Sequence, residues 1–399
     1  MTISEKSGPL HGVRVVELVG IGPGPFAAML LADLGADVIR VDRPGGNALR
    51  LGPPEQDLLG RGRPSVALDL KDPRGVATVL DLVASADILI EGLRPGVTER
   101  LGLGPADCHA RNPRLVYGRM TGWGQDGPLA QTAGHDITYI SVAGALGTIG
   151  RAGGPPQVPL NLLGDFAGGA MYLVTGVLAA LTHARATGEG QVVDAAITDG
   201  TAHLMSMIVG MQQSGGWSDA RGTNLLDTGT PFYDVFETSD GGWMAVGPLE
   251  PQFFGALVAG LGLDDAPGQW DLGRWDELRT LLADTFASRT RAEWEQVFDG
   301  TDACVAPVLS LTEAYAHPHN VARGTYVEHE GLTQPAPAPR FSATPATLTT
   351  PPRAPGADTT TALTAWGITD VDQLVADGVA VQTGQTTETD QTTRTDQEN

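Results

Sequence analysis

The chain has 399 residues, of which 41% are hydrophobic and 53 are glycine, so it has room for two domains with a buried core and a cleft. Its formal net charge of -22, with no Lys/Arg-rich run, would repel a phosphate backbone, and we expect no nucleic-acid partner. Only two cysteines occur, Cys108 and Cys304, which excludes a disulfide scaffold and a cysteine-based zinc site. Residues 1–100 carry a net charge of only -2, so an anionic small ligand is best tolerated there.

Features that would direct the chain to a membrane or out of the cell are missing from the sequence pattern. The first residues lack the basic start and apolar stretch of a signal peptide, and no uncharged apolar run reaches the ~18 residues of a membrane span. We therefore expect a cytoplasmic protein with no membrane partner.

Strands and helices alternate through the first half of the sequence. Buried strands are predicted over 13–18, 36–42, 65–70, 86–92, 114–120 and 191–197. Helices are predicted over 25–35, from Pro73 behind the cap Asp72, near Ala106, over 164–185 and over 203–213. This alternation predicts an α/β fold with a Rossmann-like, doubly wound parallel sheet. The helix over 164–185 is apolar nearly all round, which predicts burial in the core or at a subunit interface.

Composition changes along the chain suggest the domain organisation. We predict a large domain over 1–215, a Gly-rich linker over 216–230 and a smaller α+β domain over 231–315, with a hairpin around Asp240-Gly241-Gly242. A Pro-rich strap over 316–356 is expected to return to the large domain. The acidic tail over 357–399, rich in Thr, Gln and Asp, is predicted to be mostly disordered.

A glycine-rich turn follows the first predicted strand. Gly22, Gly24 and Ala27 match the loose form of a dinucleotide-binding turn, and Asp42 closes the next strand as in a nicotinamide site. Pro23 and Pro25 remove N–H donors from that turn, so a turn that only packs a helix on a strand is an equal alternative.

Basic residues cluster near the expected carboxyl ends of the strands, where open α/β sheets bind ligands. They are Arg43, Arg61, Arg63, Lys71 and Arg94. Arginine suits phosphate recognition, although each position alone also fits solvated surface.

His135 and Asp165 stand out as titratable residues in Gly-rich surroundings. Asp165 is expected at the start of the long apolar helix, where N–H groups stabilise a carboxylate or a developing oxyanion. A simple helix cap at Asp165 and a structural hydrogen bond at His135 are the alternatives. His317 and His319 lack further metal-binding partners, and no Gly-x-Ser-x-Gly nucleophile motif occurs.

Four ordered segments carry a resemblance to a known family. They are RPGVTERLGLGP (94–105), YGRMTGWGQDGP (117–128), AGHDITYI (133–140) and PLNLLGDFAGG (159–169). Together they resemble the family III CoA-transferase (CaiB/BaiF) superfamily, and within it the α-methylacyl-CoA racemase branch. The resemblance covers residues 9–350. It implies an interlocked homodimer of two-domain chains that acts on an acyl-CoA substrate.

The resemblance also implies a reaction. A racemase would interconvert (2R)- and (2S)-2-methylacyl-CoA thioesters by 1,1-proton transfer through an enolate, with His135 and Asp165 as bases on opposite faces of the α-carbon. The alternative is a family III CoA transferase in which Asp165 is a nucleophile that forms an acyl anhydride. A third reading is an acyl-CoA binding protein without catalysis. The histidine in Gly-His-Asp favours the racemase.

By the same resemblance, Glu250 orients His135 from the partner subunit, and no metal or cofactor beyond the CoA moiety of the substrate is needed. Backbone N–H groups at Asp165 and its helix start are expected to serve the enolate. The residues expected to bind CoA are Arg43, Leu68, Asp69, Leu70, Lys71, Ala86, Asp87, Ile88, Arg94, Gly134, Asp136, Ile137, Thr138, Tyr139 and Gly164.

Overall fold

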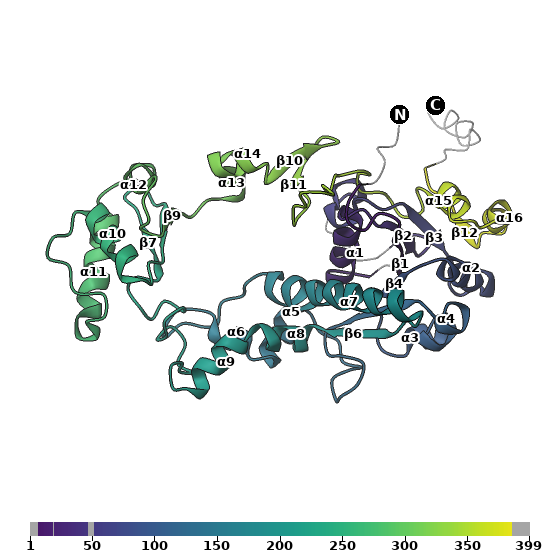
Figure 1. Cartoon of the computed structure of the whole chain (residues 1–399), viewed down its shortest axis with the longest axis horizontal. Helices are drawn as coiled ribbons and strands as arrows, with labels where there is room; N and C mark the ends of the chain where they lie inside the picture. The colour runs from purple at the N-terminus through teal and green to yellow at the C-terminus, as the bar shows by residue number, and fades with distance from the viewer. Residues whose placement is uncertain (1–6, 19, 47–51, 385–399) are drawn as a thin grey trace, which may run out of the picture. The chain divides into compact units, whose positions relative to one another are not determined.

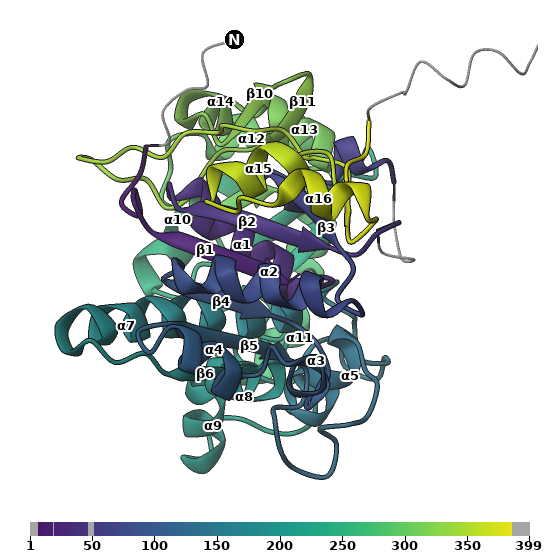
Figure 2. The same ribbon diagram turned by 90° about the vertical axis from the view of Figure 1, so that its right-hand side faces the viewer.

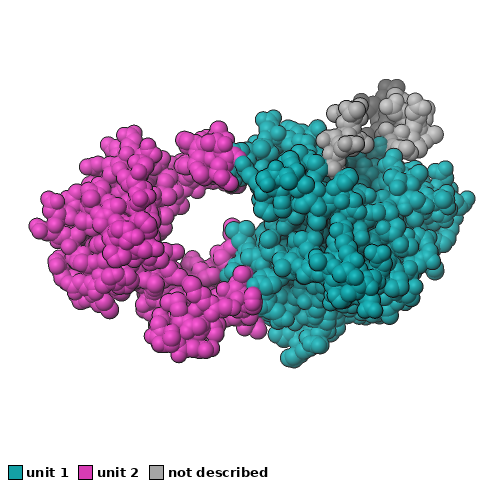
Figure 3. Space-filling view, in the orientation of Figure 1, with its two compact units in different colours: residues 1–139, 161–201, 324–399 teal, residues 140–160, 202–323 magenta. Residues whose placement is uncertain are grey.

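The computed structural model describes residues 7–18, 20–46 and 52–384 of the chain. The chain divides into two compact units (Figure 3). Unit 1 comprises residues 1–139, 161–201 and 324–399, and unit 2 comprises residues 140–160 and 202–323. Segments 140–160 and 202–215, predicted within the large domain, therefore belong to unit 2, because they contact that unit more than the sheet.

A seven-stranded sheet forms the centre of unit 1 (Figure 1). Its order is β12-β3-β2-β1-β4-β5-β6, and every pair is parallel except β12 with β3. The strands are β1 (Arg14–Leu18), β2 (Asp37–Asp42), β3 (Ser65–Leu68), β4 (Ile88–Glu91), β5 (Val116–Thr121), β6 (Val192–Ala196) and β12 (Ala380–Val381). The six predicted strands and the large parallel sheet are thereby confirmed.

Alternating side chains of these strands enter two separate cores, because successive residues of a strand point to opposite faces. Val15 joins the cluster formed with α1 (Pro23–Asp33) and α7 (Met171–Thr187). Val16 joins the cluster on the other face with α2 (Pro73–Ala84) and α4 (Pro105–Arg111). Each inner strand is buried on both faces, which is why the sequence shows continuous apolar runs there.

The capping residue and the proline that the sequence predicted at the start of α2 are both in place. The Asp72 side chain caps α2 by accepting a hydrogen bond from the Arg74 N–H at 2.9 Å, and Pro73 occupies the first helical position. The other helical segments of unit 1 are η1 (Pro54–Gln56), η2 (Leu58–Gly60), α3 (Val97–Leu101), η3 (Leu162–Ala170), α15 (Thr359–Ala365) and α16 (Val371–Ala376). Two more, α5 (Asp136–Val142) and α8 (Ile197–Leu204), begin in unit 1 and end in unit 2.

The π-helical segment η3 continues directly into α7, giving one helix over Leu162–Thr187. By length and composition it is sufficient to cross a membrane, contrary to our expectation from the sequence, and it is the one such helix in the part of the chain that the structure describes. Leu173, Val177 and Leu181 are buried in the core cluster that α7 shares with the sheet. This face accounts for part of the apolar composition, since 39% of the most apolar stretch of the helix is buried.

Unit 2 contains a small three-stranded sheet and its own core. The predicted hairpin is present as β7 (Asp234–Glu237) paired antiparallel with β8 (Trp243–Val246), and β9 (Val305–Pro307) pairs with β8. Phe286 and Trp294 are among the aromatic side chains that fill the core. The helices are α6 (Ala145–Thr148), α9 (Ser206–Gln213), α10 (Pro251–Leu261), η4 (Leu272–Arg274), α11 (Trp275–Phe286), α12 (Arg291–Phe298), α13 (Leu311–Ala316) and α14 (Pro318–Arg323).

The segment predicted as a linker, 216–230, is a tightly bonded part of unit 2. Asn224 and Asp227 are buried, and the Asp227 carboxylate accepts hydrogen bonds from the backbone N–H groups of Gly222 and Asn224 at 2.8 and 2.7 Å. Glycines in this segment permit turns, and turns alone do not make a linker flexible when polar side chains satisfy the backbone.

The strap joins unit 1, the return that the sequence predicted, whereas part of the tail differs from its prediction. From Gly324 onward the chain belongs to unit 1, where β10 (Tyr326–His329) and β11 (Leu332–Pro335) form a hairpin. Residues 357–384, predicted as disordered tail, instead form α15, α16 and β12, which cover the β3 edge of the sheet (Figure 2). The composition is polar, but its few apolar residues fall at helical spacing and become buried. The rest of the tail, 385–399, lies outside the described residues.

We predict that Leu363→Ala lowers the free energy of unfolding by roughly 2–4 kcal/mol, because Leu363 is fully buried against the sheet. Thr364→Ala, at the neighbouring exposed position, should change it by less than about 0.5 kcal/mol. Urea denaturation of the full chain measures both values. Equal values for the two variants would mean that this segment has no core role.

Candidate active site

A cavity of about 1060 Å³ opens in unit 1 at the carboxyl ends of the central strands. The strand order reverses between β1 and β4, so the loops that follow these two strands separate and leave a crevice. Residues 20–25 after β1, 92–95 after β4 and 120–123 at the end of β5 line it. His135 and Asp165 line the same cavity, so the structure brings together the two residues that the sequence singled out.

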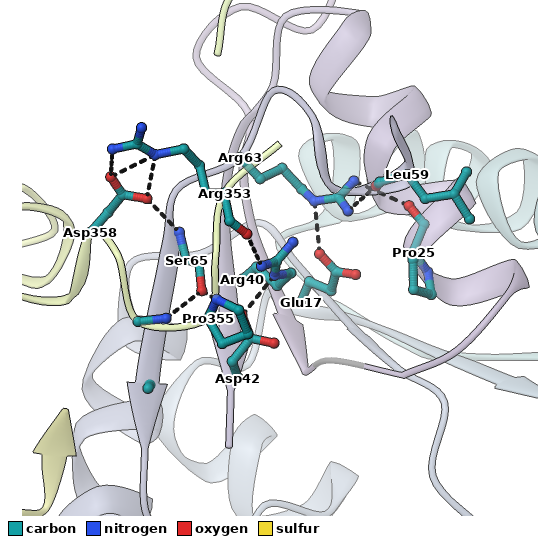
Figure 4. Close-up of polar contacts among 12 residues, drawn as sticks. Glu17, Pro25, Arg40, Asp42, Leu59, Arg63, Ser65, Arg353, Pro355 and Asp358 are labelled. Atoms are coloured by element: carbon teal, nitrogen blue, oxygen red, sulfur yellow. Dashed lines mark hydrogen bonds and ion pairs between the residues drawn. The ribbon is translucent and has the colours of Figure 1, made fainter. Parts of the chain in front are cut away.

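The glycine-rich turn after β1 serves this cavity without the features of a nicotinamide site. Asp42, the residue that would bind a ribose, is buried and its Oδ2 accepts hydrogen bonds from Arg40 Nε at 2.8 Å and Ser65 Oγ at 2.5 Å (Figure 4). An acceptor occupied in this way does not recognise a ribose hydroxyl. Of the two readings of the turn, the structure favours the one in which it packs a helix on a strand.

His135 lies on the loop before α5, where its own backbone is fixed. Its N–H donates to Thr138 Oγ1 at 3.0 Å, and its carbonyl accepts a hydrogen bond from the Thr138 N–H at 2.8 Å. The residue is exposed toward the cavity. A neutral imidazole accepts a proton and an imidazolium donates one, so this position suits acid–base chemistry.

Asp165 lies in the first turns of η3 and is half-buried. Burial raises the pKa of this carboxyl above its ordinary value, and the negative charge of Asp136 adds to that effect. A hydrogen bond from Asn161 Nδ2 to Asp165 Oδ2 at 3.3 Å and the charge of His135 favour the ionised form. A carboxylate with a raised pKa is a stronger base than an exposed one.

Asp136 joins the His135 loop to the Asp165 helix. Its Oδ2 accepts a hydrogen bond from the Asp165 N–H at 2.6 Å, and the Gly164 N–H also donates to this carboxylate. Burial raises the pKa of Asp136, and these two donors lower it. The N–H groups that we expected to stabilise an enolate are thus occupied by Asp136, and that expectation was wrong.

Tyr139 and Trp123 form the aromatic part of the wall, with ring centroids 4.8 Å apart in an edge-on arrangement. The Tyr139 hydroxyl donates to the Gly134 carbonyl at 2.5 Å, which closes the loop that carries His135. A Cβ at Gly122 would lie 2.0 Å from the Tyr139 ring, so the close approach requires glycine there. Burial raises the pKa of Tyr139.

The residues expected to bind CoA are only partly at the cavity. Arg94, Gly134 and Tyr139 line it, whereas Asp136 and Gly164 support it from behind. Arg43 is exposed after β2, and Ile137 and Thr138 are exposed on α5; none of the three is among the lining residues.

Two expected CoA segments lie away from the cavity. Ala86, Asp87 and Ile88 are at the amino end of β4, with Ile88 fully buried and Asp87 bonded to the Arg14 N–H at 2.9 Å. Ligands of parallel sheets commonly bind at the carboxyl ends of strands, and contact of these three residues with CoA stays a prediction. The segment Leu68, Asp69, Leu70 and Lys71 does follow β3, yet Leu68 is core and none of the four lines the cavity.

Two of the arginines proposed for phosphate are structural. Arg61 is buried and its Nη2 lies 2.6 Å from Asp33 Oδ2, while its Nη1 donates to Gln334 in β11 at 2.8 Å. Arg63 is fully buried with its Nε 2.9 Å from Glu17 Oε2. Arg63 does border the cavity, but its charge is neutralised from within.

Sequence reasoning missed a second part of the wall, formed by residues 52–54 and 56–60 together with Arg353 and Pro355 of the strap. No local signal marks Arg353 and Pro355, because they reach the cavity only through the return of the strap to unit 1. Asn161 and Trp123 lay within motifs already quoted, PLNLLGD and MTGWG, and the signal for them was present.

Glu250 lies in unit 2, exposed, at the residue before α10. Its negative charge contributes to the raised pKa of Cys304, for which burial is the larger cause. Its relation to His135 stays a prediction. Among the described residues, no group of three or more His, Cys, Asp or Glu side chains is placed to hold a metal ion.

A buried ionic network supports the loop that carries Arg94. Glu91, at the end of β4, accepts a hydrogen bond from the Leu93 N–H at 2.7 Å, and its Oε1 lies 3.0 Å from Arg119 Nε. Arg119 also contacts Glu99 at 2.8 Å. Burial raises the pKa of Glu91 to about 6, whereas the hydrogen bond from Arg119 lowers the pKa of Glu99.

This network predicts opposite pH effects for its two carboxylates. The contribution of Glu91 to stability is full below its unfolded pKa of 4.5 and is lost as pH rises through about 6. From about pH 4.5 to about pH 8, the stability of the wild type should therefore fall relative to Glu91→Gln by about 1.5 kcal/mol. Relative to Glu99→Gln, the wild type should instead gain stability as pH rises. Urea denaturation across pH measures both, and parallel curves for all three proteins would contradict the network.

Comparison with known proteins identifies the family. Residues 10–359 match the model of CoA-transferase family III, and the chain belongs to this family. It is 48% identical over 340 residues to human "Alpha-methylacyl-CoA racemase", covering 84% of this chain and 87% of that protein. It is 30% identical over 381 residues to human "Succinyl-CoA:glutarate CoA-transferase", covering 88% and 84%.

Among solved structures, the chain is similar to a CaiB/BaiF family protein from Brucella suis. The TM-score is 0.77 at 27% identity, and the match covers 90% of this chain and all of that one. The mixed α/β fold with a large parallel sheet is therefore the fold of this family.

Proposed function

We propose that the protein is an α-methylacyl-CoA racemase that interconverts (2R)- and (2S)-2-methylacyl-CoA thioesters. The observation that carries the proposal is the placement of His135 and Asp165 on the wall of one cavity in unit 1, close enough for the His135 charge to affect the pKa of Asp165. The chain is 48% identical to the human racemase and 30% identical to the human transferase, so the comparison supports racemisation over CoA transfer.

In the proposed mechanism one of the two residues, as base, takes the proton from the α-carbon. The electron pair of that C–H bond forms the C=C bond of an enolate, whose negative charge rests on the former thioester oxygen. The other residue, as acid, then gives its proton to the opposite face of the planar α-carbon, and the thioester carbonyl re-forms. The configuration is inverted, and the two residues have exchanged protonation states.

Asp136 positions both residues in this scheme. Its carboxylate holds the backbone of Asp165 through the 2.6 Å hydrogen bond, while its own backbone follows directly on His135. The α-carbon must lie within reach of both bases, and misplacement by about 1 Å can cost ~10²-fold in rate.

Substrate recognition is proposed to use Arg94 at the cavity and Arg43 beside it for the phosphates of CoA, since arginine offers forked donors. In this reaction one proton leaves the α-carbon and another returns to it, and no electrons pass to an external acceptor. It therefore needs no cofactor beyond the CoA moiety of the substrate. We propose the cytoplasm as its compartment, supported by two free cysteines.

We also propose that two chains form an interlocked homodimer in which Glu250 of one chain orients His135 of the other. Large apolar side chains that are exposed in the single chain support an interface, since exposed apolar clusters mark contact surfaces. They include Val142, Leu160, Leu162 and Met207, each more than half exposed. A carboxylate beside His135 would fix its tautomer and stabilise the imidazolium.

The racemase is tested with a single stereoisomer of a 2-methylacyl-CoA in deuterated water. The wild type should incorporate deuterium at the α-carbon with loss of optical purity, and His135→Ala and Asp165→Ala should each lower inversion at least about 100-fold. His319→Ala, at an exposed histidine, is the control. Absence of exchange, together with trapping of an acyl group at Asp165 by hydroxylamine when an acceptor acid is supplied, would favour the transferase instead.

The role of Glu250 predicts complementation between subunits. His135→Ala and Glu250→Gln homodimers should both be impaired, whereas a heterodimer of the two contains one intact site if Glu250 acts across the interface. The purified heterodimer should then regain about half of the wild-type rate per dimer, because one of two sites is restored. A heterodimer no more active than its parents would place Glu250 in the same chain as its histidine, or outside the site.

A further inference from the structure

We propose that Gly22 and Asn161 form a clamp on the Oδ2 atom of Asp165, which fixes the orientation of this carboxylate and leaves its Oδ1 atom to exchange the proton with substrate. The two are positioning residues. This inference deepens the proposed racemase function and rests on it for the identity of the reaction.

The Gly22 side of the clamp is steric. Gly22 precedes α1 with φ +68° and ψ -109°, a backbone conformation that L side chains rarely adopt. A Cβ at this position would lie 2.9 Å from Asp165 Oδ2 and 3.6 Å from its Cγ. The turn therefore leaves room for the carboxylate only because residue 22 is glycine, and an added methyl group would have to displace the carboxylate.

The Asn161 side of the clamp is polar. Asn161 Nδ2 donates to the same oxygen, Oδ2, at 3.3 Å from a residue immediately before η3. A donor to the ionised form stabilises it and lowers the pKa, opposing the burial that raises it. Because the steric and the polar contact both involve Oδ2, Oδ1 is the oxygen that remains for the reaction.

A buried ion pair holds the Gly22 turn in place. Arg63 and Glu17 are fully buried, and the guanidinium donates to the Pro25 carbonyl at 3.1 Å and also to the Leu59 carbonyl (Figure 4). Pro23 and Pro25 restrict φ on either side of Gly24, so the turn has little freedom to move away. The steric side of the clamp is thus rigid.

Other charges face Asp165 and are common to all variants of the clamp. Asp136 contacts its backbone and raises its pKa, and His135 lowers it. Burial and the negative charge of Asp165 raise the pKa of Tyr139, and the positive charge of Arg94 lowers it. None of these groups is altered when Gly22 or Asn161 is replaced.

The clamp is tested without relying on turnover, by ¹³C NMR titration of protein labelled at aspartate Cγ, with the Asp165 signal assigned by its loss in Asp165→Asn. Asn161→Ala should raise the pKa of Asp165 by about one unit, because a hydrogen bond to a charged group is lost. Asn161→Asp, with the same shape and an added negative charge, should raise it further. Gly22→Ala should also raise it, by moving Oδ2 away from Asn161.

Gly12→Ala is the matched control for Gly22→Ala. Gly12 has φ +82°, so alanine is strained there as well, but its Cβ would meet nothing within 4 Å. Both alanine variants should lose thermal stability, and only Gly22→Ala should shift the titration of Asp165. In the deuterium-exchange assay, Gly22→Ala should lower kcat by about 100-fold with little change in KM. The acid limb of the kcat/KM profile of Asn161→Ala should move to higher pH.

The results separate the two proposals. An Asp165 pKa that is the same in the wild type and in all three variants at Gly22 and Asn161 would overturn the clamp, whether or not the wild type exchanges the α-proton. If the variants show the predicted order of Asp165 pKa values but the wild type exchanges no α-proton, the clamp is supported and the racemase activity is excluded. A Gly22→Ala enzyme indistinguishable from Gly12→Ala in both readouts would refute the steric side.

Discussion

The reversal of strand order between β1 and β4 is the constraint on which the site depends. The loops that follow β1 and β4 leave the sheet in opposite directions, so a space remains between them that neither loop fills. The Gly22 turn and the loop of Arg94 form two sides of that space. The helix η3 then brings Asp165 to the turn, and Asp136 ties His135 to the same place through the Asp165 backbone.

Three buried ionic contacts surround this crevice, at Glu17–Arg63, Arg40–Asp42 and Glu91–Arg119. Removing such charges from water costs more than a single ion pair returns, as the raised pKa of Glu17 beside Arg63 indicates. Each pair also holds backbone groups of a loop at the cavity rim, through Pro25, Arg353 and Leu93. We interpret these pairs as devices that fix loop positions at some expense of stability.

The C-terminal part of the chain completes the same region from a distance. The Ser65 hydroxyl donates to Asp42, and its oxygen accepts a hydrogen bond from the Gly356 N–H at 2.9 Å, while Asp358 accepts one from the Ser65 N–H (Figure 4). The strap thereby brings Arg353 and Pro355 to the cavity, and β12 pairs with β3 at the sheet edge. An exposed parallel edge is a site of unwanted pairing, so its cover also protects the fold.

The sequence by itself determined the six parallel strands of the large sheet, helices such as α1, α2 and α7, and the choice of His135 and Asp165 as candidate residues, which share one cavity wall. These follow from local hydrophobic periodicity, from capping residues such as Asp72, and from motifs that are contiguous along the chain. Only the tertiary structure decided that Asp136 occupies the N–H groups of Gly164 and Asp165, that Asp42 is bonded internally, and that Ala86–Ile88 lie at the amino end of β4 and do not line the cavity. It also decided that 357–384 is core. These outcomes depend on which groups meet across long sequence separations, and the burial and hydrogen bonding of a polar residue are set by those partners and not by its neighbours in the chain.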